Sequence, residues 1–305
     1  MEKIQIFVTH WVNKHIIELN DVLVEMVTFL EKITDYPHET IVVCYCPNGD
    51  NSIDEIYERL PNTRIEKNNR PKRPDIQPSL RNKIVDIANN CPFVILHNDT
   101  RVSAGWLESI ISDFNDAESL YGKNNCIIAP RFIPYHYIPE IIEPKYPKFW
   151  ESLQCNTKCL SIEKMREWCN IWNFKFNNNI VCSLPSSPFT DDGHQLMMFM
   201  SRREFFDKEL GGIGECDENF VGMNYDDQDW GIRALLAGKK NLKSQRCLIG
   251  HIEGLSFFQP NILKMLTNND KIFVQKWGKD LFDEMQTGQL WIRLHKEQQN
   301  DDRRV

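Results

Sequence analysis

Two stretches of the chain carry carboxylates whose placement suits chemistry as well as folding. The first is the apolar run 93–96, which stops abruptly and is soon followed by Asp99. The second stretch, 224–230, contains Asp226 and Asp227 side by side. A carboxylate can hold a hard divalent cation through its oxygens, and another can take a proton from an attacking hydroxyl group. The pattern suggests these two roles.

Structural explanations for the same acids stay open. Asp99 can turn the chain before a helix, because Asp is a common turn residue. Asp226 and Asp227 can satisfy free N–H groups in the first turn of a helix. Asp229 can form an ion pair with Arg233 one helical turn later. Each acid therefore has both a chemical and a structural interpretation.

A third apolar run, beginning at residue 247, ends at His251 much as the first ends near Asp99. A lone histidine is more often part of hydrogen-bonded structure than a ligand, so a metal role is one of two explanations. The chain has ten cysteines without a repeating metal spacing. This favours buried reduced thiols over a zinc site.

The elements that must position these residues alternate between strands and helices. Strand-like runs lie at 4–8, 41–44, 93–96, 126–130 and 196–200, and helical spacing of apolar residues lies at 19–33, 53–60, 80–87 and 106–114. A last helix is expected to begin after Asn224 and to end at Gly238. This order predicts an α/β fold with a single Rossmann-like sheet, mixed but mostly parallel and flanked by helices. Ligands bind at the carboxyl ends of such strands, where Asp99 falls. Asn224 is the expected N-cap of the last helix.

The segment 131–188 breaks the alternation and is rich in proline and aromatic residues. We expect an insertion over the ligand edge of the sheet, with a helix at about 162–172, because long loops in compact domains are usually functional. Aromatic faces there, such as Trp150, could stack on sugar rings, although ordinary packing is the alternative. We divide the chain into a domain, 1–265, and a C-terminal helical extension and tail, 266–305.

Composition excludes several classes of function. The chain has 305 residues, 41% of them hydrophobic, and a formal charge of −7, which argues against general nucleic-acid binding. No apolar run approaches the roughly 20 residues that span a bilayer, so we expect a cytoplasmic protein without a transmembrane segment or signal peptide. The glycines at 211–214 precede acids and do not follow a strand, which disfavours a nicotinamide cofactor.

The connection 67–81 carries five Lys and Arg residues among three prolines. A solvated loop is the usual explanation for such a cluster. The alternative is a cationic flap near an anionic ligand, since the connection leads into the helix before the Asp99 strand.

Taken in order, these stretches resemble the family 2 glycosyltransferases of the A-type fold. The matching pieces are Leu-His-Asn-Asp-Thr at 96–100, Gly-Trp-Leu-Glu at 105–108, Gly-Gly ahead of Asp-Glu-Asn-Phe at 217–220, Tyr-Asp-Asp-Gln-Asp-Trp at 225–230, and the strand-end histidine. The resemblance covers about residues 3 to 256. It implies an A-type glycosyltransferase fold with the aromatic-rich segment as an insertion.

The resemblance also implies roles for individual residues. Asp99 would hold the metal, with His251 on the metal or phosphate side, and Asp227 would be the catalytic base with Asp226 as its neighbour. Contacts to the donor would come from Thr9, His10, Tyr45, Asp50, Arg81, Asn82 and Asn98, and contacts to the acceptor from Trp150, Asp229 and Trp230. Asn98 stands where the family usually has another acid, and Tyr45-Cys46 where it commonly has an aspartate.

The activity implied is that of a metal-dependent, hexosyltransferase-like enzyme that uses Mn²⁺ or Mg²⁺. It would move a sugar from a nucleotide-diphosphate donor, with a UDP-sugar favoured, to a hydroxyl group on a glycan, protein or small molecule. A cation would neutralise the departing diphosphate, and a carboxylate would deprotonate the acceptor, which predicts inversion by single displacement. The alternatives are a retaining transferase on the same fold and a weakly active protein that binds nucleotide sugars.

Overall fold

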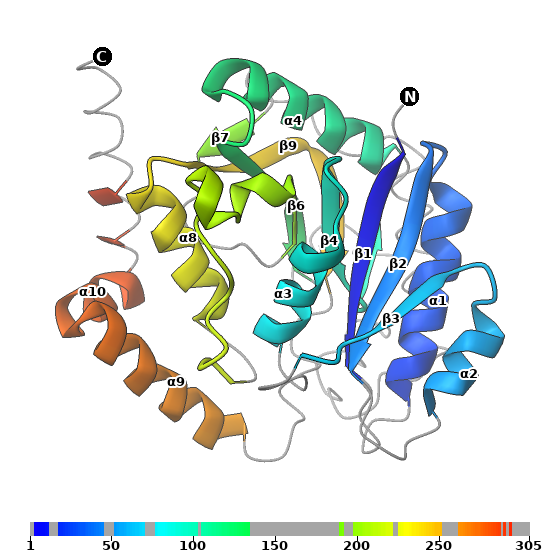
Figure 1. Cartoon of the computed structure of the whole chain (residues 1–305), viewed down its shortest axis with the longest axis horizontal. Coiled ribbons are helices and arrows are strands. Elements are labelled where there is room, and N and C mark those ends of the chain that lie inside the picture. The colour runs from blue at the N-terminus through cyan, green and yellow to red at the C-terminus, as the bar shows by residue number, and fades with distance from the viewer. Residues whose placement is uncertain are drawn as a thin grey trace, which may run out of the picture.

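The structure of the chain is a computed structural model. It describes residues 3–11, 18–45, 52–70, 77–102, 105–134, 189–191, 198–221, 225–251, 262–287, 289–290 and 293–294. The described residues form one sheet with helices on both faces (Figure 1), which confirms the predicted α/β class. The expected helix at 162–172 and nearly all of the insertion at 131–188 lie outside the described residues.

The sheet of the described residues has nine strands. They are β1 (Ile4–Trp11), β2 (His38–Tyr45), β3 (Arg64–Lys67), β4 (Phe93–His97), β5 (Thr100–Val102), β6 (Cys126–Pro134), β7 (Phe189–Asp191), β8 (Phe199–Ser201) and β9 (Lys240–His251). The order is β3-β2-β1-β4-β8-β6-β9-β5, and β7 also pairs with β9. The pairings make β1, β2, β3, β4, β6 and β9 point one way, with β5, β7 and β8 opposed. The predicted mixed, mostly parallel sheet is confirmed.

Alternation along the strands explains why helices cover both faces. In β1, Ile6 and Val8 lie in a core with the helices of one face, whereas Phe7 lies in the core of the other. The first face is covered by α1 (Glu18–Ile33), α2 (Ser52–Arg59) and α4 (Trp106–Tyr121). The second is covered by α3 (Gln77–Ile87) and α8 (Asp226–Leu236). Strands buried on both faces are apolar throughout, as the runs in the sequence are.

The carboxyl ends of the parallel strands meet at one edge, as predicted. Register pairs Thr9 of β1 with His97 of β4, and Trp11 with Tyr45 of β2. At the far end of the strand order, His251 at the end of β9 pairs in register with Thr100 of β5. The third apolar run of the sequence therefore ends beside the residue that follows Asp99.

Several strand boundaries differ from the sequence-based expectation. The strand expected at 126–130 continues to Pro134, the one expected at 196–200 is β8 and runs antiparallel, and the one ending at His251 begins at Lys240. The strands β3, β5 and β7 were not expected. They are three or four residues long and mostly polar, so no apolar period distinguishes them from loops.

Two further helices, α9 (Ile262–Trp277) and α10 (Lys279–Gln286), follow the sheet. Their apolar residues form a cluster with Phe220, Tyr225 and Ile232, so they pack on the α8 region. The proposed division at 265/266 falls inside α9. None of the helices in the described part of the chain is long and apolar enough to cross a membrane.

The pair Gly211-Gly212 closes a compact turn after the 3₁₀ helices Arg203–Phe205 and Lys208–Leu210. Gly211 has φ +78° and open space around it. At Gly212, an added Cβ would lie 2.5 Å from Asp207 N and 2.6 Å from the carbonyl oxygens of Asp207 and Phe205. All three atoms are backbone, so the turn itself would have to open.

We predict that Gly212→Ala destabilises the protein more than Gly211→Ala. Left-handed backbone costs an alanine about 1–2 kcal/mol at residue 211. Overpacking against backbone at residue 212 costs at least the upper end of the usual range of about 1–3 kcal/mol. Urea unfolding of both variants measures the difference. Equal free energies of unfolding would contradict the close approach.

Candidate active site

The two adjacent acids of the second stretch begin helix α8 and are almost fully buried. Asp226 is 5% exposed and Asp227 is 4% exposed. Tyr225, immediately before them, has a left-handed backbone with φ +73°, and the Gln228 side chain accepts a 2.6 Å hydrogen bond from its N–H. The N-cap is therefore Tyr225 and not Asn224, because Gln228 supplies the reciprocal cap contact. The positive end of the helix dipole favours anionic side chains here.

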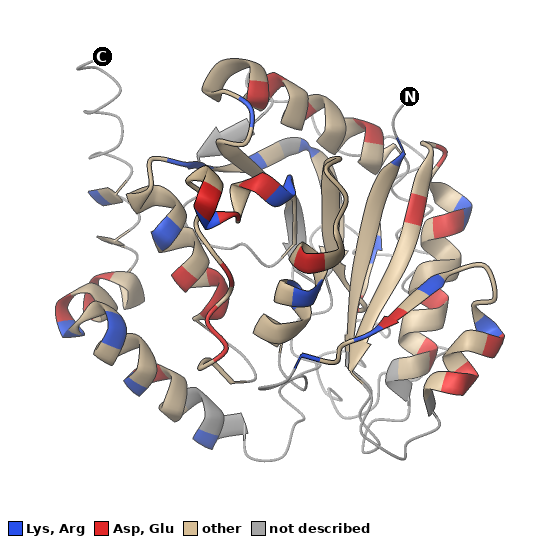
Figure 2. Cartoon of the chain, in the orientation of Figure 1, with Lys and Arg blue, Asp and Glu red and all other residues tan. Residues whose placement is uncertain are grey.

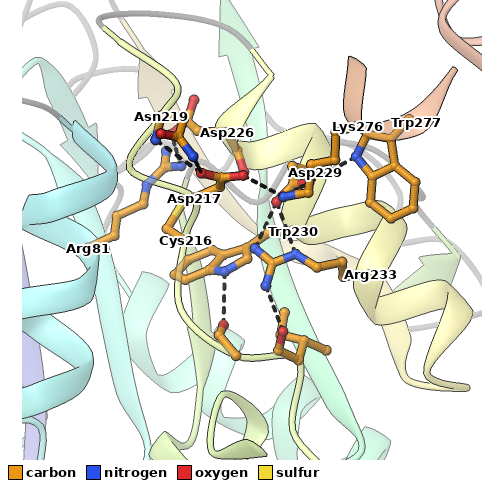
Figure 3. A network of polar contacts seen from close by, with 12 residues as sticks. Arg81, Cys216, Asp217, Asn219, Asp226, Asp229, Trp230, Arg233, Lys276 and Trp277 are labelled. Carbon is orange, nitrogen blue, oxygen red and sulfur yellow. Dashed lines mark hydrogen bonds and ion pairs between the residues drawn. The ribbon is translucent and has the colours of Figure 1, made fainter. Parts of the chain in front are cut away.

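A buried arginine neutralises one of these two carboxylates. Arg81 of α3 is 2% exposed, and its Nη1 donates to Asp226 Oδ2 at 2.5 Å (Figure 3). Two ionised carboxylates in one buried position repel each other, so a single cation cannot balance both. The ion pair therefore distinguishes Asp226 from Asp227.

Asp227 has the properties of a general base. Burial, and then the charge of Asp226, raise its pKa to about 7, although Arg81 opposes both. A base whose pKa lies near the working pH is ionised often enough to act and still accepts a proton readily. Buried acids with strongly raised pKa values are typical of catalytic sites.

The loop before α8 is fixed to α3 by polar contacts. The Asn82 side chain accepts from Cys216 N at 2.7 Å and donates to Cys216 O and to Glu218 Oε1. Arg70 forms ion pairs with Glu218, Glu215 and Asp86 at 2.6–2.9 Å. In the described part of the connection 67–81, Arg70 and Arg81 thus bind carboxylates of the protein, and residues 71–76, with Lys72 and Arg73, lie outside the described residues.

Helix α3 links these acids to the edge where Asp99 lies. At its N-terminus, Gln77 Nε2 donates to Thr9 Oγ1 at 3.0 Å and lies 3.2 Å from His97 Nε2. Gln77 and Arg81 are four residues apart, so they share one face of α3, about 6 Å apart along the axis. Figure 1 shows α3 between α8 and the strands β4 and β1. The two acid-bearing stretches are therefore tied to the same helix.

His10, at the same edge, is held between two amides. Its Nε2 lies 3.0 Å from Asn20 Oδ1, and Asn98 Nδ2 lies 3.0 Å from its Nδ1. Burial lowers the pKa of His10 to about 4, although the Asn20 contact opposes this shift. A neutral ring that donates to Asn20 and accepts from Asn98 satisfies both contacts. The ring of His10 thus holds the side chain of Asn98 in place, and its predicted donor contact stays a prediction.

Asp99 follows β4 and is 8% exposed, next to Thr100, whose register partner is His251. Within the described residues, no group of three or more His, Cys, Asp or Glu side chains gathers in a way that could hold a metal ion. The side chain of His251 is outside that description. The Asp99 carboxylate and the Asn98 amide oxygen are ligands of the kind that Mn²⁺ accepts, so these two residues fit a cation held partly by its ligand.

The remaining predicted residues divide into buried and undescribed ones. Asp229 and Trp230 are 0% exposed; Asp229 binds Arg233 of its own helix, and the Trp230 indole donates to Gly214 O at 3.1 Å. Their contacts are those of packing within the protein, and we assign neither to the acceptor. Tyr45 is the half-buried last residue of β2. Asp50 and Trp150 lie outside the described residues.

Three features of the site carry no signal in the sequence. Gln77 links β1, β4 and α3, Tyr225 supplies the strained residue before the acids, and the Asn20 amide fixes His10. Each acts through a partner far away in the chain or through a backbone angle. Only the Gln77-Pro78 step, typical of a helix start, gives a hint.

The fold is that of the A-type glycosyltransferases. No protein-family model and no curated protein sequence matches the chain. Among solved structures it is similar to GalNAc-T7, crystallised with UDP, GalNAc and Mn²⁺, with a TM-score of 0.56 and 13% identity over 92% of this chain and 50% of that chain. The match to TarS 1–349 of S. aureus has a TM-score of 0.44 and 10% identity, and it covers 90% of this chain and 66% of that chain.

The chain thus spans about half the length of the GalNAc-T7 chain. At this identity the likeness shows the glycosyltransferase fold alone, and membership of family 2 stays a prediction.

The raised pKa of Asp227 predicts a pH-dependent cost to stability. The folded protein keeps a proton on Asp227 up to pH about 7, whereas the unfolded chain releases it near pH 4. Between about pH 4 and pH 7 the folded state therefore binds more protons than the unfolded chain does. The free energy of unfolding falls as pH rises through this range. We expect Asp227→Asn, which cannot ionise, to melt several degrees above the wild type at pH 8 and closer to it at pH 5.

Thermal unfolding across pH 5–8 measures this difference. Glu209→Gln, at an exposed position, is the matched control and should follow the wild type throughout. A constant gap between Asp227→Asn and the wild type would contradict the raised pKa.

Proposed function

We propose that the protein is a glycosyltransferase that moves a sugar from a nucleotide-diphosphate donor to a hydroxyl acceptor. One observation carries the proposal: a buried acid pair at a helix N-terminus, with one member neutralised by Arg81 and the other titrating near pH 7. The A-type fold supports the proposal, because ligands bind at the carboxyl edge of such a sheet, and Asp99 follows β4 at that edge. The enzyme class follows from the combination of fold and acids.

Asp227 is the general base in this proposal. A sugar hydroxyl is a poor nucleophile at neutral pH, so its proton must be removed as it attacks the anomeric carbon. The proton moves to a carboxylate oxygen of Asp227, and the bond from carbon to the phosphate oxygen breaks on the opposite side. This in-line exchange inverts the configuration, as in other displacements assisted by one base. Asp226 stays paired with Arg81 and keeps the pKa of Asp227 raised.

Asp99, Asn98 and His251 would hold a divalent cation. The Asn98 amide nitrogen lies against His10, so its oxygen is the atom that we assign to the cation. When bound, the cation would neutralise the charge of the departing nucleoside diphosphate. The similar fold of GalNAc-T7 was crystallised with UDP and Mn²⁺, which supports Mn²⁺ and a UDP-sugar as the first choices.

The remaining contacts are divided between the donor and the acceptor. Thr9 lies near the end of β1 and Tyr45 ends the neighbouring strand β2, and both are proposed to contact the nucleoside. Arg81 and Asn82, expected at the donor, are proposed instead to hold the catalytic loop and acid pair. The acceptor is proposed to lie under the segment 131–188, which includes Trp150.

Asp227→Asn and Asp99→Ala should separate chemistry from donor binding. Asp227→Asn should keep donor affinity and lose about 10²–10⁴ in turnover, the usual contribution of a general base. Asp99→Ala should lose the part of the binding that depends on Mn²⁺. Calorimetry with UDP-GlcNAc and UDP-GalNAc, with and without Mn²⁺, and assays of UDP release measure both.

Unchanged turnover in Asp227→Asn would remove the base assignment, and Glu209→Gln serves as the control for both assays. NMR of the product distinguishes inversion from retention by the anomeric configuration. Tight donor binding without UDP release in the wild type would instead indicate a binding protein.

The pH dependence of kcat should report Asp227. Turnover requires the ionised base, so it should fall as pH drops below about 7. The variant Asp226→Asn removes the negative charge that raises the pKa of Asp227, and it keeps Arg81, whose positive charge lowers that pKa. The pKa of Asp227 should therefore fall. The acid limb should therefore move to lower pH by at least one unit. A limb that stays in place would show that another group controls the rate.

A further inference from the structure

Helix α9 contacts α8 at Asp229, which follows the acid pair in the chain. Lys276 Nζ lies 2.8 Å from Asp229 Oδ1, and the Trp277 indole nitrogen donates to the same oxygen at 2.9 Å (Figure 3). Asp229 follows the two catalytic acids by less than one turn of α8. A carboxylate shielded from solvent destabilises the folded state unless it is fully hydrogen-bonded. Lys276 and Trp277 therefore determine where Asp229, and with it the first turn of α8, can lie.

The same helix binds the segment upstream of the acids. The Asn269 amide exchanges two hydrogen bonds with the backbone of Val221, at 2.9 and 3.0 Å. The next residue of α9, Asp270, accepts a 2.6 Å hydrogen bond from the hydroxyl of Tyr225. Burial, and then Asp270, raise the pKa of this hydroxyl to about 12, so it stays a donor at neutral pH.

Charge and packing support these contacts. Figure 2 shows acidic residues along the segment before α8 and basic ones along α9. Lys276 also binds Asp217 at 2.7 Å, and this bond, with others from Asn219, holds the pKa of Asp217 below its ordinary value although burial would raise it. The rings of Tyr225 and Phe273 lie 5.2 Å apart. Helix α9 thus contacts the segment 217–229 at four residues: Asp217, Val221, Tyr225 and Asp229.

We propose that α9 positions the catalytic turn, by which we mean residues 225–229 at the start of α8. It acts chiefly through the hydrogen bond from Trp277 to Asp229. This inference rests on the proposed function, because the orientation that it explains is that of Asp227. Lys276 is about a third exposed, so solvent weakens its ion pair, whereas the Trp277 bond is made to a fully buried carboxylate oxygen. A displacement of about 1 Å at a catalytic group can cost 10²-fold in rate.

Asp229 Oδ1 would still accept from Lys276 in Trp277→Phe, and Arg233 would still bind Oδ2. The fold should therefore survive, and the loss should appear in the orientation of the turn. We expect Trp277→Phe to lower kcat at least 10-fold while the donor KM stays within twofold. Lys276→Met should have a smaller effect, and Lys276→Arg should restore it. Lys271→Met, at an exposed position of the same helix, is the matched control.

Hydrogen exchange gives a readout that does not depend on activity. In Trp277→Phe, peptides spanning 225–230 should exchange faster, whereas peptides spanning 93–97 in β4 should not change. Faster exchange together with a lower kcat supports the proposal. Exchange or kcat equal to that of Lys271→Met would overturn the positioning role. A wild-type protein that transfers no sugar from any UDP-sugar would count against the proposed function, and the exchange of 225–230 would still decide the role of Trp277.

Discussion

The ion pair between Arg81 and Asp226 is the contact on which the site depends. It joins α3 to α8 on one face of the sheet, and it places a cation against one of two adjacent buried acids. Without Arg81, Asp226 would be an uncompensated charge in the interior, which is among the most destabilising arrangements in proteins. With it, the charge of Asp226 has a partner, while burial and then the charge of Asp226 raise the pKa of Asp227 to about 7. A single guanidinium therefore sets both the packing of two helices and the chemistry at their junction.

The α/β sheet supplies the other half of the arrangement. Parallel strands deliver Thr9, Tyr45 and Asp99 to one edge, and Gln77 connects that edge to the helix that carries Arg81. Side chains at this edge mostly contact one another: His10 orients Asn98, and Asn82 fixes the loop at Cys216. Much of what the site needs is rigidity, because a base and a cation act together only if neither can drift.

The sequence predicted the sheet, its direction and the two acid-bearing stretches, because these depend on local period and on residue type. It could not predict which residues far apart in the chain would bind one another. Arg81 and Asp226 are separated by 145 residues and Trp277 and Asp229 by 48, and no local pattern marks either pair. The sequence suggests a donor contact for Arg81 and an acceptor contact for Asp229, and the structure shows that each binds a distant side chain of the protein. The short polar strands β3, β5 and β7 were missed because pairing, and not hydrophobicity, defines them.

The order of the chain has a consequence for biosynthesis. The sheet strands and α8 emerge from the ribosome before α9, and Trp277 is added 48 residues after the carboxylate that it binds. A nascent chain stalled before α9 can pair its strands but lacks the donors that hold Asp229 and Tyr225 in place. Assembly of the first turn of α8 therefore has to wait until α9 has been synthesised.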